Sequence, residues 1–205
     1  MSAACQLPPP ATVPGTETLK LRHWPGWWGE ATATLKGLQA EVPWQQDSIH
    51  IFGQRRLLPR LTCWMADPGF DYAYSGEQQI PQPWIPRVLD LRRALAAIAG
   101  CAFNSVLLNL YRDGNDRMGW HADDEAELDP SAPIASLSLG ATRSFRFKPK
   151  GRGPQSGERH CLELGHGDLL LMDPPTQEHW LHELPSRRRV SQPRLNLTFR
   201  RLRPR

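Results

Sequence analysis

The chain has 205 residues and a mass of 23.2 kDa, which suits one domain with at most a loose arm. Hydrophobic residues make up 40% of it and charged residues 22%, and the mean hydropathy of −0.52 excludes a bundle of membrane-spanning helices. The net charge of +4 conceals a skew, because the last twenty residues hold eight arginines and no acid. Arginine binds phosphate and carboxylate well, so this segment fits either a polyanionic partner or a solvated tail.

Residues 1–16 are rich in Pro, Ala and Thr, so we expect a disordered arm followed by a single domain over residues 17–205. The N-terminus shows neither a basic start nor an apolar stretch, and we expect no secretory signal. The cysteines lie far apart without a C-x-x-C pair, which indicates reduced thiols. These features favour a cytoplasmic protein, or a nuclear one in a eukaryote.

The first elements in chain order surround a group of tryptophans. Leu19–Trp44 holds four of them, and so much aromatic surface predicts that the segment packs against the body. Asp47–Leu58 reads as a short strand, SIHIF, followed by a basic turn from Gly53 to Arg56. Apolar residues at helical spacing predict a helix over Pro86–Ala99, which Gly100 would end.

From residue 103 onward the hydrophobic period changes to two. Seven short alternating runs follow one another, separated by turn residues, and Pro149–Gly157 fits a hairpin connection. The pattern predicts a mostly β fold with flanking helices, whose core over about 103–202 is an antiparallel double sheet of jelly-roll type, a double-stranded β-helix. The seven runs are FNSVLLNLY, PIASLSLG, RSFRFKP, HCLELG, GDLLLMD, HWLHELP and RLNLTFRRL.

The last of these strands carries an unusual polar face. Alternation places Arg194, Asn196, Thr198 and Arg200 on one side, opposite three apolar residues. Such a face is either a solvated outer surface or, if it points inward, a cradle that holds a small dianion between two arginines.

A second polar face occurs on the first of the seven runs. Asn109 and Tyr111 share a side of an otherwise apolar strand, opposite Leu108 and Leu110. An amide and a phenol placed in this way can orient an oxygen-rich ligand, whereas two residues alone are also typical of an edge with solvated tips.

Metal ligands are suggested by the segment that begins at Trp120. In an extended segment His121 and Asp123 project to the same side, so that one nitrogen and one oxygen can share an ion. A distal histidine would complete a facial triad with open positions, the arrangement that suits iron(II). His179 and His182 are both available, and their spacing alone does not choose between them.

Taken in order, these pieces resemble the AlkB family of iron(II)- and 2-oxoglutarate-dependent dioxygenases, closest to its duplex-acting DNA-repair branch. The resemblance runs from about Asp47 to Leu202 and rests on a set of motifs. They are N-L-Y (109–111), H-A-D (121–123), P-I-A-S-L-S-L-G (133–140), H-W-L-H (179–182) and R-L-N-L-T-F-R (194–200).

The resemblance implies a role for each matching residue. His121, Asp123 and His182 match the iron ligands, and it is the family pattern that selects His182 over His179. Arg194 and Tyr111 match the residues that hold the far carboxylate of 2-oxoglutarate. Three more line the same pocket: Arg200 near the metal-chelating end, Asn109 and Asn196. Catalysis is then centred on Fe(II), 2-oxoglutarate and O2, with no separate general acid or base.

The same resemblance implies a flipped base as substrate, because the target atom must reach the iron. Glu125 matches a carboxylate that contacts the base, which methylation leaves cationic. An N-terminal nucleotide-recognition lid over about 47–80 would supply further contacts, from Trp64, Tyr72, Tyr74 and Ser75.

The resemblance implies that residues at the start of this lid separate the strands and bind phosphates. Phe52 resembles the apolar finger that fills the gap left by a flipped base, although a buried strand residue is an equal alternative. Arg55, Arg56 and Arg60 would bind phosphates beside it. Arg187–Arg189 fit either a phosphate-binding turn or a plain solvated turn. Gln54 departs from the family pattern.

The implied activity is oxidative demethylation of bases such as 1-methyladenine and 3-methylcytosine, with release of formaldehyde and conversion of 2-oxoglutarate and O2 to succinate and CO2. The expected partner is alkylated DNA, single- or double-stranded, or RNA, bound by a monomer without a membrane partner. Two alternatives stay open: a related dioxygenase acting on RNA or on a protein side chain, and a non-catalytic nucleic-acid-binding domain. An intact triad with both arginines argues against the last.

Overall fold

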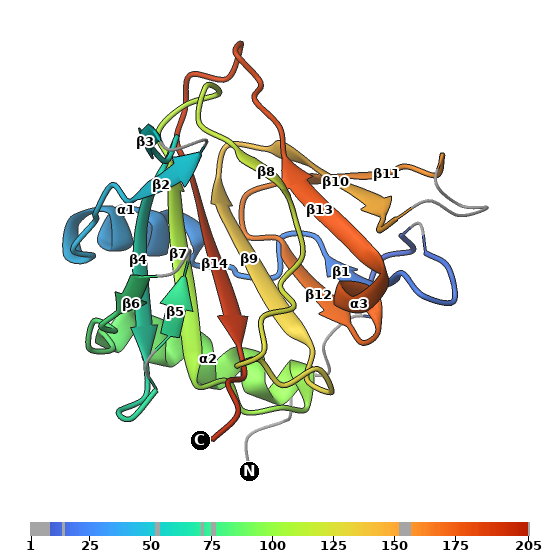
Figure 1. Cartoon of the computed structure of the whole chain (residues 1–205), viewed down its shortest axis with the longest axis horizontal. Coiled ribbons are helices and arrows are strands. Elements are labelled where there is room, and N and C mark those ends of the chain that lie inside the picture. The colour runs from blue at the N-terminus through green and yellow to red at the C-terminus, as the bar shows by residue number, and fades with distance from the viewer. Residues whose placement is uncertain are drawn as a thin grey trace.

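Two antiparallel sheets form the body of the protein, seen here in a computed structural model (Figure 1). It describes residues 9–13, 15–51, 54–70, 72–74, 77–151 and 157–204. The larger sheet contains, in spatial order, β1 (Lys20–Trp24), β12 (Leu169–Asp173), β9 (Ile134–Gly140), β14 (Arg194–Arg200), β7 (Ser105–Tyr111) and β4 (Leu61–Ala66). The smaller sheet contains β11 (His160–Leu164), β10 (Arg143–Pro149), β13 (Trp180–Leu184) and β8 (Met118–His121).

This arrangement confirms the predicted jelly-roll core. Each of the seven alternating runs forms a strand, and β10 pairs antiparallel with β11 across the glycine-rich connection. A cluster of buried apolar residues joins the two sheets, and it includes Phe147, Leu170 and Trp180. The period of two therefore located the strands and the faces that they bury.

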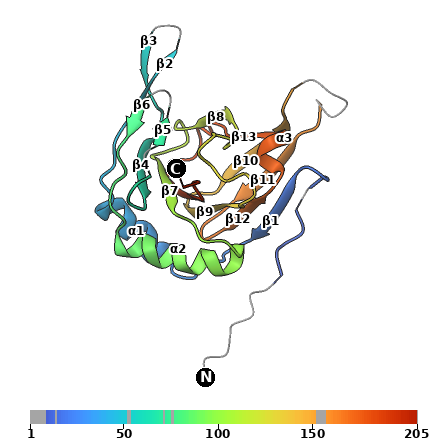
Figure 2. The same ribbon diagram turned by 60° about the horizontal axis from the view of Figure 1, so that its bottom comes forward.

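Helices cover the outer face of the larger sheet (Figure 2). The predicted helix is confirmed as α2 (Pro86–Ala99), and Gly100 ends it with a φ of 65°, a conformation that glycine adopts without strain. A further helix, α1 (Ala31–Glu41), lies in the tryptophan-rich segment, where no helix was expected, and it packs beside α2. The short α3 (Thr176–His179) precedes β13.

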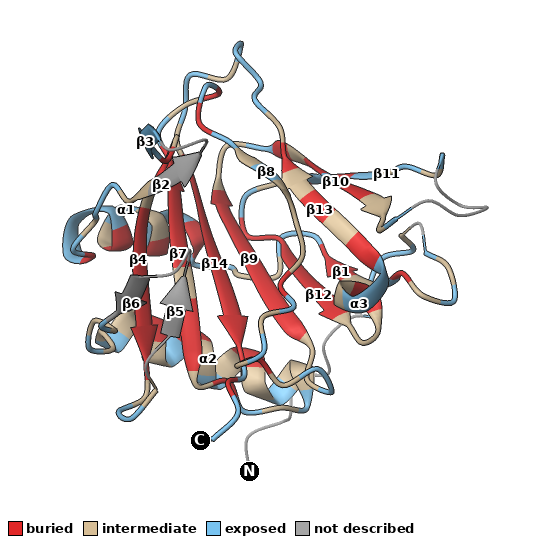
Figure 3. Ribbon diagram, viewed as in Figure 1, coloured by how far each residue is buried: buried red, intermediate tan, exposed pale blue. Residues whose placement is uncertain are grey.

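The central strand β14 is buried on both faces (Figure 3), which explains its unusual sequence. Its apolar residues Leu195, Leu197 and Phe199 belong to the core cluster beneath the helices. Because neighbouring residues point to opposite faces, its polar residues must turn into the space between the sheets. The polar face is therefore an interior wall and not a solvated surface.

The tryptophan-rich segment joins the body through β1, as predicted. β1 pairs with β12 over its full length, and Trp24 is buried in the outer core cluster. Asp168 fixes the turn that follows β1, since its carboxylate accepts hydrogen bonds from the backbone N–H groups of Gly26 and Gly165, both at 2.8 Å, and lies 3.1 Å from His23 Nε2. Upstream, the N–H of Ala11 donates to the carbonyl of His23 at 2.6 Å, so this part of the N-terminal arm lies against β1.

The segment predicted as a lid contains two hairpins near the β4 edge of the larger sheet (Figure 2). β2 (Ser48–Ile51) pairs with β3 (Gln54–Leu57), and β5 (Tyr72–Tyr74) pairs with β6 (Glu77–Gln79). β4, between the hairpins, pairs with β7 over six residues and so belongs to the main sheet. The predicted basic turn is wrong at Arg55 and Arg56, which lie in a strand.

Within the described part of the chain, no helix is long and apolar enough to cross a membrane.

We expect Asp168→Asn to lower the free energy of unfolding at pH 7 by about 1–3 kcal/mol, because the hydrogen bonds to a buried carboxylate weaken. Burial by itself raises the pKa of Asp168, but the His23 and backbone hydrogen bonds outweigh it and lower the pKa below its ordinary value. The stabilisation is therefore present above the unfolded-state pKa and is lost as the pH falls through the folded-state pKa. Urea titrations from pH 7 to pH 3 should show the two proteins converging.

The matched control is Asp90→Asn, whose side chain is 66% exposed on α2. It should change stability little at any pH. If the difference in the free energy of unfolding between Asp168→Asn and the original chain were as large at pH 3 as at pH 7, the ionised carboxylate of Asp168 would not be the source of the stabilisation.

Candidate active site

The polar wall of β14 faces a cavity between the sheets. β14 lies between β7 and β9, and its register sets Arg194 beside Tyr111 and Asn196 beside Asn109. The two polar faces identified in the sequence are thus one continuous surface. We call this space the inner cavity, and it is lined by Asn109, Tyr111, Met118, His121, Asp123, Ser136, Phe145, Met172, His182, Leu184, Arg194, Asn196, Thr198 and Arg200.

Three candidate metal ligands meet at one side of the inner cavity. One ligand atom from each of His121, Asp123 and His182 lies within 4.8 Å of the others. His121 and His182 occupy facing positions on β8 and β13, and Asp123 follows two residues after His121. The local reason is the pairing of these strands, which brings together residues that are 61 positions apart.

Hydrogen bonding fixes the tautomer of His121. Its Nδ1 lies 2.8 Å from the carbonyl oxygen of Gly119, which can only accept, so Nδ1 carries the proton. Nε2 is then the atom with a free lone pair, the usual state of a histidine ligand whose other nitrogen is held by the backbone. Burial lowers the pKa of His121, which keeps the ring neutral.

His182 is 3% exposed, and its ring lies 4.1 Å from the ring of His121 between centroids. Burial, followed by the nearby His121, lowers the pKa of His182 to about 3, so the imidazole is uncharged at neutral pH. Its Nδ1 is buried and has no hydrogen-bond partner among the described residues. His179, the alternative, has a side chain that is 44% exposed and lies beside Glu178. The geometry therefore places His182, and not His179, in the cluster.

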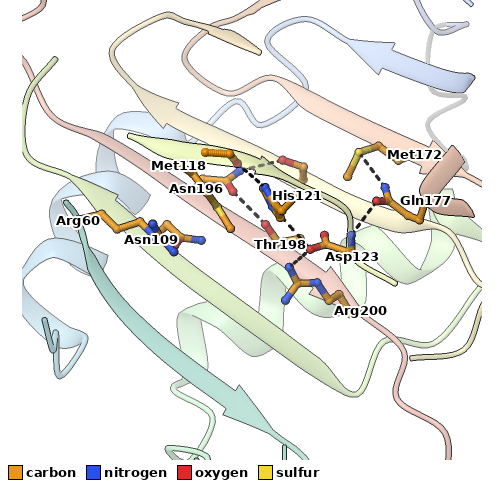
Figure 4. A network of polar contacts seen from close by, with 12 residues as sticks. Arg60, Asn109, Met118, His121, Asp123, Met172, Gln177, Asn196, Thr198 and Arg200 are labelled. Carbon is orange, nitrogen blue, oxygen red and sulfur yellow. Dashed lines mark hydrogen bonds and ion pairs between the residues drawn. The ribbon is translucent and has the colours of Figure 1, made fainter. Parts of the chain in front are cut away.

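Asp123 is held from two sides (Figure 4). Arg200 Nη2 donates to its Oδ1 at 2.7 Å, and its backbone N–H donates to Gln177 Oε1 at 2.9 Å. Burial by itself raises the pKa of Asp123, but the charge of Arg200 and the two histidines outweigh it and lower the pKa to about 2. Asp123 is therefore a permanent carboxylate.

This set of donors fits a divalent iron ion. Two neutral imidazoles and one carboxylate form the facial triad of ferrous oxygenases. The second oxygen of Asp123, Oδ2, is buried and has no hydrogen-bond partner among the described residues. A bound cation would satisfy this oxygen, which otherwise carries the full cost of burial.

The far end of the inner cavity holds a buried cation. Arg194 is 1% exposed, donates to Ser138 Oγ at 2.8 Å, and lies over the ring of Tyr111 at 5.5 Å. Burial lowers the pKa of Arg194 to about 10, and no described carboxylate forms an ion pair with it. An uncompensated buried guanidinium of this kind is a site for an anionic ligand.

A second cavity meets the triad from the side of β4. We call it the outer cavity, and it is lined by Asp47, Leu58, Arg60, Thr62, Trp64, Leu107, Met118, His121, Asp123, Glu125 and Arg200. Glu125 Oε2 is buried there without a hydrogen-bond partner among the described residues. The inner and outer cavities share Met118, His121, Asp123 and Arg200, so ligands in the two would meet at the triad.

Two of the predicted lid contacts, Arg60 and Trp64, line the outer cavity. Arg60 is 3% exposed, and it donates from Nε to Asn109 Oδ1 at 2.8 Å. The prediction that Arg60 binds phosphate is therefore wrong, because its guanidinium lies inside the protein. Arg55 and Arg56 are exposed on β3.

The remaining lid predictions concern residues at the limit of what is described. Tyr72 and Tyr74 lie in β5, but their side chains are outside the described part of the structure. Phe52 and Ser75 also lie outside the described residues.

Sequence reasoning missed Gln177, Ser138 and Asp47, each of which contacts or lines the site. Gln177 lies 54 positions from Asp123, and no local pattern marks such a contact. For Ser138 a signal existed: the alternation of S-L-S-L places both serines of β9 on the face opposite its leucines.

Comparisons with known proteins agree with this geometry. Residues 21–200 match the model of the 2OG-Fe(II) oxygenase superfamily. The chain is 42% identical to the DNA oxidative demethylase ALKBH2 of Mus musculus, over 85% of this chain and 76% of that protein. It is 39% identical to the alpha-ketoglutarate-dependent dioxygenase alkB homolog 3 of Bos taurus, over 85% of this chain and 63% of that protein. The solved structure of OsALKBH1 superposes on this chain with a TM-score of 0.57 and 18% identity. The match covers 88% of this chain and 97% of that one, which indicates a shared fold.

We expect saturating succinate to raise the melting temperature of the protein by about 5–10 °C, because a dicarboxylate compensates the buried charge of Arg194. In Arg194→Met this rise should disappear, while the melting temperature without ligand stays equal or increases, since an unpaired buried cation is removed. Thermal denaturation with and without succinate measures both effects.

Arg93→Met is the matched control, because the Arg93 side chain is 74% exposed on α2. It should keep the full succinate shift. An undiminished shift in Arg194→Met would show that the anion binds elsewhere.

Proposed function

Because the chain belongs to the 2OG-Fe(II) oxygenase superfamily, and within it to the AlkB family, we propose that it is a DNA oxidative demethylase. It removes methyl groups from ring nitrogens of bases such as 1-methyladenine and 3-methylcytosine, releases formaldehyde, and converts 2-oxoglutarate and O2 to succinate and CO2. The observation that carries this function is the meeting of two cavities at one cluster of His121, Asp123 and His182.

These three residues are the proposed iron ligands. Bound Fe(II) supplies the activation of O2 that couples decarboxylation of 2-oxoglutarate to oxidation of the methyl group. The protein keeps both imidazoles neutral through burial and keeps the carboxylate ionised through Arg200, so the ligands are ready to bind without losing a proton at neutral pH. No separate general acid or base is needed among the residues of the chain.

The inner cavity is the proposed site of 2-oxoglutarate. Arg194 and Tyr111 would hold its far carboxylate, because they form the end of the cavity away from the triad. Arg200 would stand beside its metal-chelating end, since it already contacts Asp123. Asn109 and Asn196 lie on facing positions of β7 and β14. They would line the part of the cavity that holds the carbon atoms between the two carboxylates of 2-oxoglutarate.

The outer cavity is the proposed site of the flipped base. Trp64, Leu107 and Met118 give it apolar walls, and Glu125 offers an unsatisfied carboxylate oxygen. A flat aromatic ring that carries positive charge fits this combination. Tyr72, Tyr74 and Ser75 would close over the base from the β5–β6 hairpin.

The nucleic-acid backbone would follow the exposed rim of the outer cavity. Arg55 and Arg56 are exposed on β3, and Arg187–Arg189 are exposed in the turn before β14. These guanidinium groups would bind phosphates without reading sequence. Phe52, between β2 and β3, would be the finger that fills the gap in the stack.

The proposed unit is one dioxygenase domain over residues 17–205, active as a monomer. A single-stranded or a duplex DNA substrate fits, and methylated RNA is tested beside both. An enzyme that acts on the genome works in the bacterial cytoplasm or in the nucleus of a eukaryote, and this is the proposed location.

The direct test combines the protein with Fe(II), 2-oxoglutarate, ascorbate and oligonucleotides that carry 1-methyladenine or 3-methylcytosine. Loss of the methyl mass from DNA, with equal release of succinate, is the expected result. Parallel reactions hold methylated RNA or a methylated peptide. Turnover on either of these, without turnover on DNA, would replace the proposed substrate.

We expect His182→Ala to reduce demethylation more than about 100-fold, because loss of a ligand costs more than loss of its supporting hydrogen bond. The same variant should bind Fe(II) or Mn(II) far more weakly in calorimetry. His179→Ala, three positions earlier and exposed, is the matched control and should keep both properties. Unchanged demethylation in His182→Ala would show that the iron is bound elsewhere.

We expect Phe52→Ala to slow repair of duplex DNA about tenfold and repair of single strands less than about twofold, since only a duplex leaves a gap to fill. Initial rates on one lesion in both contexts measure the ratio. Ile80→Ala, at a position 84% exposed, is the control for lost apolar surface. Equal losses on both substrates would remove the finger role.

A further inference from the structure

The outer cavity contains a carboxylate that the proposed chemistry has not used. Three acids line it, Asp47, Asp123 and Glu125, together with two arginines, Arg60 and Arg200. Asp123 and Arg200 form an ion pair at 2.7 Å and so compensate each other. The charges that remain to act on a ligand in the outer cavity are those of Asp47, Glu125 and Arg60.

Asp47 is held in a fixed position at the start of β2. Its Oδ2 accepts a hydrogen bond from the hydroxyl of Thr62, and its carbonyl oxygen accepts one from the N–H of Leu58 at 2.8 Å. Thr62 is 4% exposed and is itself fixed by two backbone hydrogen bonds with Gln45, at 2.8 and 2.9 Å. The carboxylate is therefore oriented by the main sheet, and not by the hairpin that follows it.

No described residue compensates this charge directly. No lysine or arginine of the described chain forms an ion pair with Asp47, and no described donor bonds to Oδ1. Arg60 lines the same cavity, but it directs Nε to Asn109 Oδ1 and Nη1 to the carbonyl of Arg117 at 3.4 Å. With Glu125, whose Oε2 is buried and unpaired among described groups, two carboxylates face one already engaged arginine.

We propose that Asp47 is a second recognition carboxylate, which acts with Glu125 to select bases that carry a positive charge. The proposal rests on the proposed function, because it concerns the base that enters the outer cavity. Methylation at N1 of adenine or N3 of cytosine leaves a cationic ring, whereas 1-methylguanine and 3-methylthymine are neutral. The net excess of one carboxylate over the arginine matches one positive charge on the ligand.

Two further features strengthen the attraction between the Asp47 carboxylate and a cationic base. Trp64, Leu107 and Met118 line the same cavity and exclude water from part of its wall, which strengthens an electrostatic contact. The Thr62 hydroxyl occupies one oxygen of Asp47 and leaves the other to meet a ring edge or an exocyclic amino group. A neutral base gains little from such a contact, so the effect is one of selectivity.

The test is Asp47→Asn, which keeps an oxygen acceptor for Thr62 and removes only the charge. Steady-state kcat and KM are measured on single-stranded oligonucleotides with 1-methyladenine, 3-methylcytosine, 1-methylguanine or 3-methylthymine. We expect kcat/KM to fall about tenfold on the two cationic bases, mainly through KM, and to change less than about twofold on the neutral ones. Asp47→Glu, which restores the charge, should recover most of the selectivity.

Asp124→Asn is the matched control, because Asp124 neighbours the triad in sequence but is exposed, pairs with Lys150 and lies outside the outer cavity. It should leave the ratio of cationic to neutral turnover unchanged. Thr62→Val reports the structural contribution of the Asp47–Thr62 hydrogen bond, and melting temperatures verify that each variant is folded.

Two results would overturn the proposal. Equal losses on cationic and neutral bases in Asp47→Asn, reproduced by Thr62→Val, would make Asp47 a structural residue. An unchanged ratio in Asp47→Asn, with the original chain active on all substrates, would remove Asp47 from recognition and leave the demethylase function intact. Failure of the original chain on every methylated base would instead refute the proposed function, and the selectivity proposal with it.

Discussion

The strict alternation of β14 is the constraint on which both the core and the site depend. Its three apolar residues complete the core beneath α1 and α2, and its four polar residues line the inner cavity. A slip of one residue against β7 or β9 would send two arginines into the apolar core and expose the cavity to leucines. Folding the core correctly therefore also assembles the anion-binding wall.

Among the described residues, one charge in the inner cavity is unbalanced before any ligand arrives, and one oxygen of the triad carboxylate lacks a hydrogen-bond donor. Arg200 compensates Asp123, and burial keeps His121 and His182 neutral. Arg194 has no described counter-ion, and Asp123 Oδ2 has no described hydrogen-bond donor. Each of these two buried groups destabilises the ligand-free protein. A metal ion beside Asp123 would remove one penalty, and a dicarboxylate beside Arg194 would remove the other.

The sequence predicted those parts of the molecule that local periodicity governs. Alternation from residue 103 located seven strands and the inward face of Arg194–Arg200, because side-chain direction repeats every two residues. It could not predict that Arg60 reaches Asn109, that Gln177 holds Asp123, or that Thr62 orients Asp47, because these contacts span 49, 54 and 15 positions. The phosphate role expected for Arg60 follows from the family resemblance. In the structure Arg60 is buried and donates to Asn109 of β7, a contact that no local pattern marks.

Two of the three proposed iron ligands, His121 and Asp123, line both cavities, so two ligands bound in separate places could both reach the metal. Under the proposed function a dicarboxylate in the inner cavity would contact Arg194, and a base in the outer cavity would contact Glu125 and Asp47. None of these three residues lines both cavities, so different side chains would recognise the two ligands. Four residues are common to both cavities, and three of them, His121, Asp123 and Arg200, belong to or contact the group of proposed iron ligands. Binding selectivity and reactivity are therefore assigned to separate side chains, and a substitution at the rim of either cavity can alter the first without destroying the second.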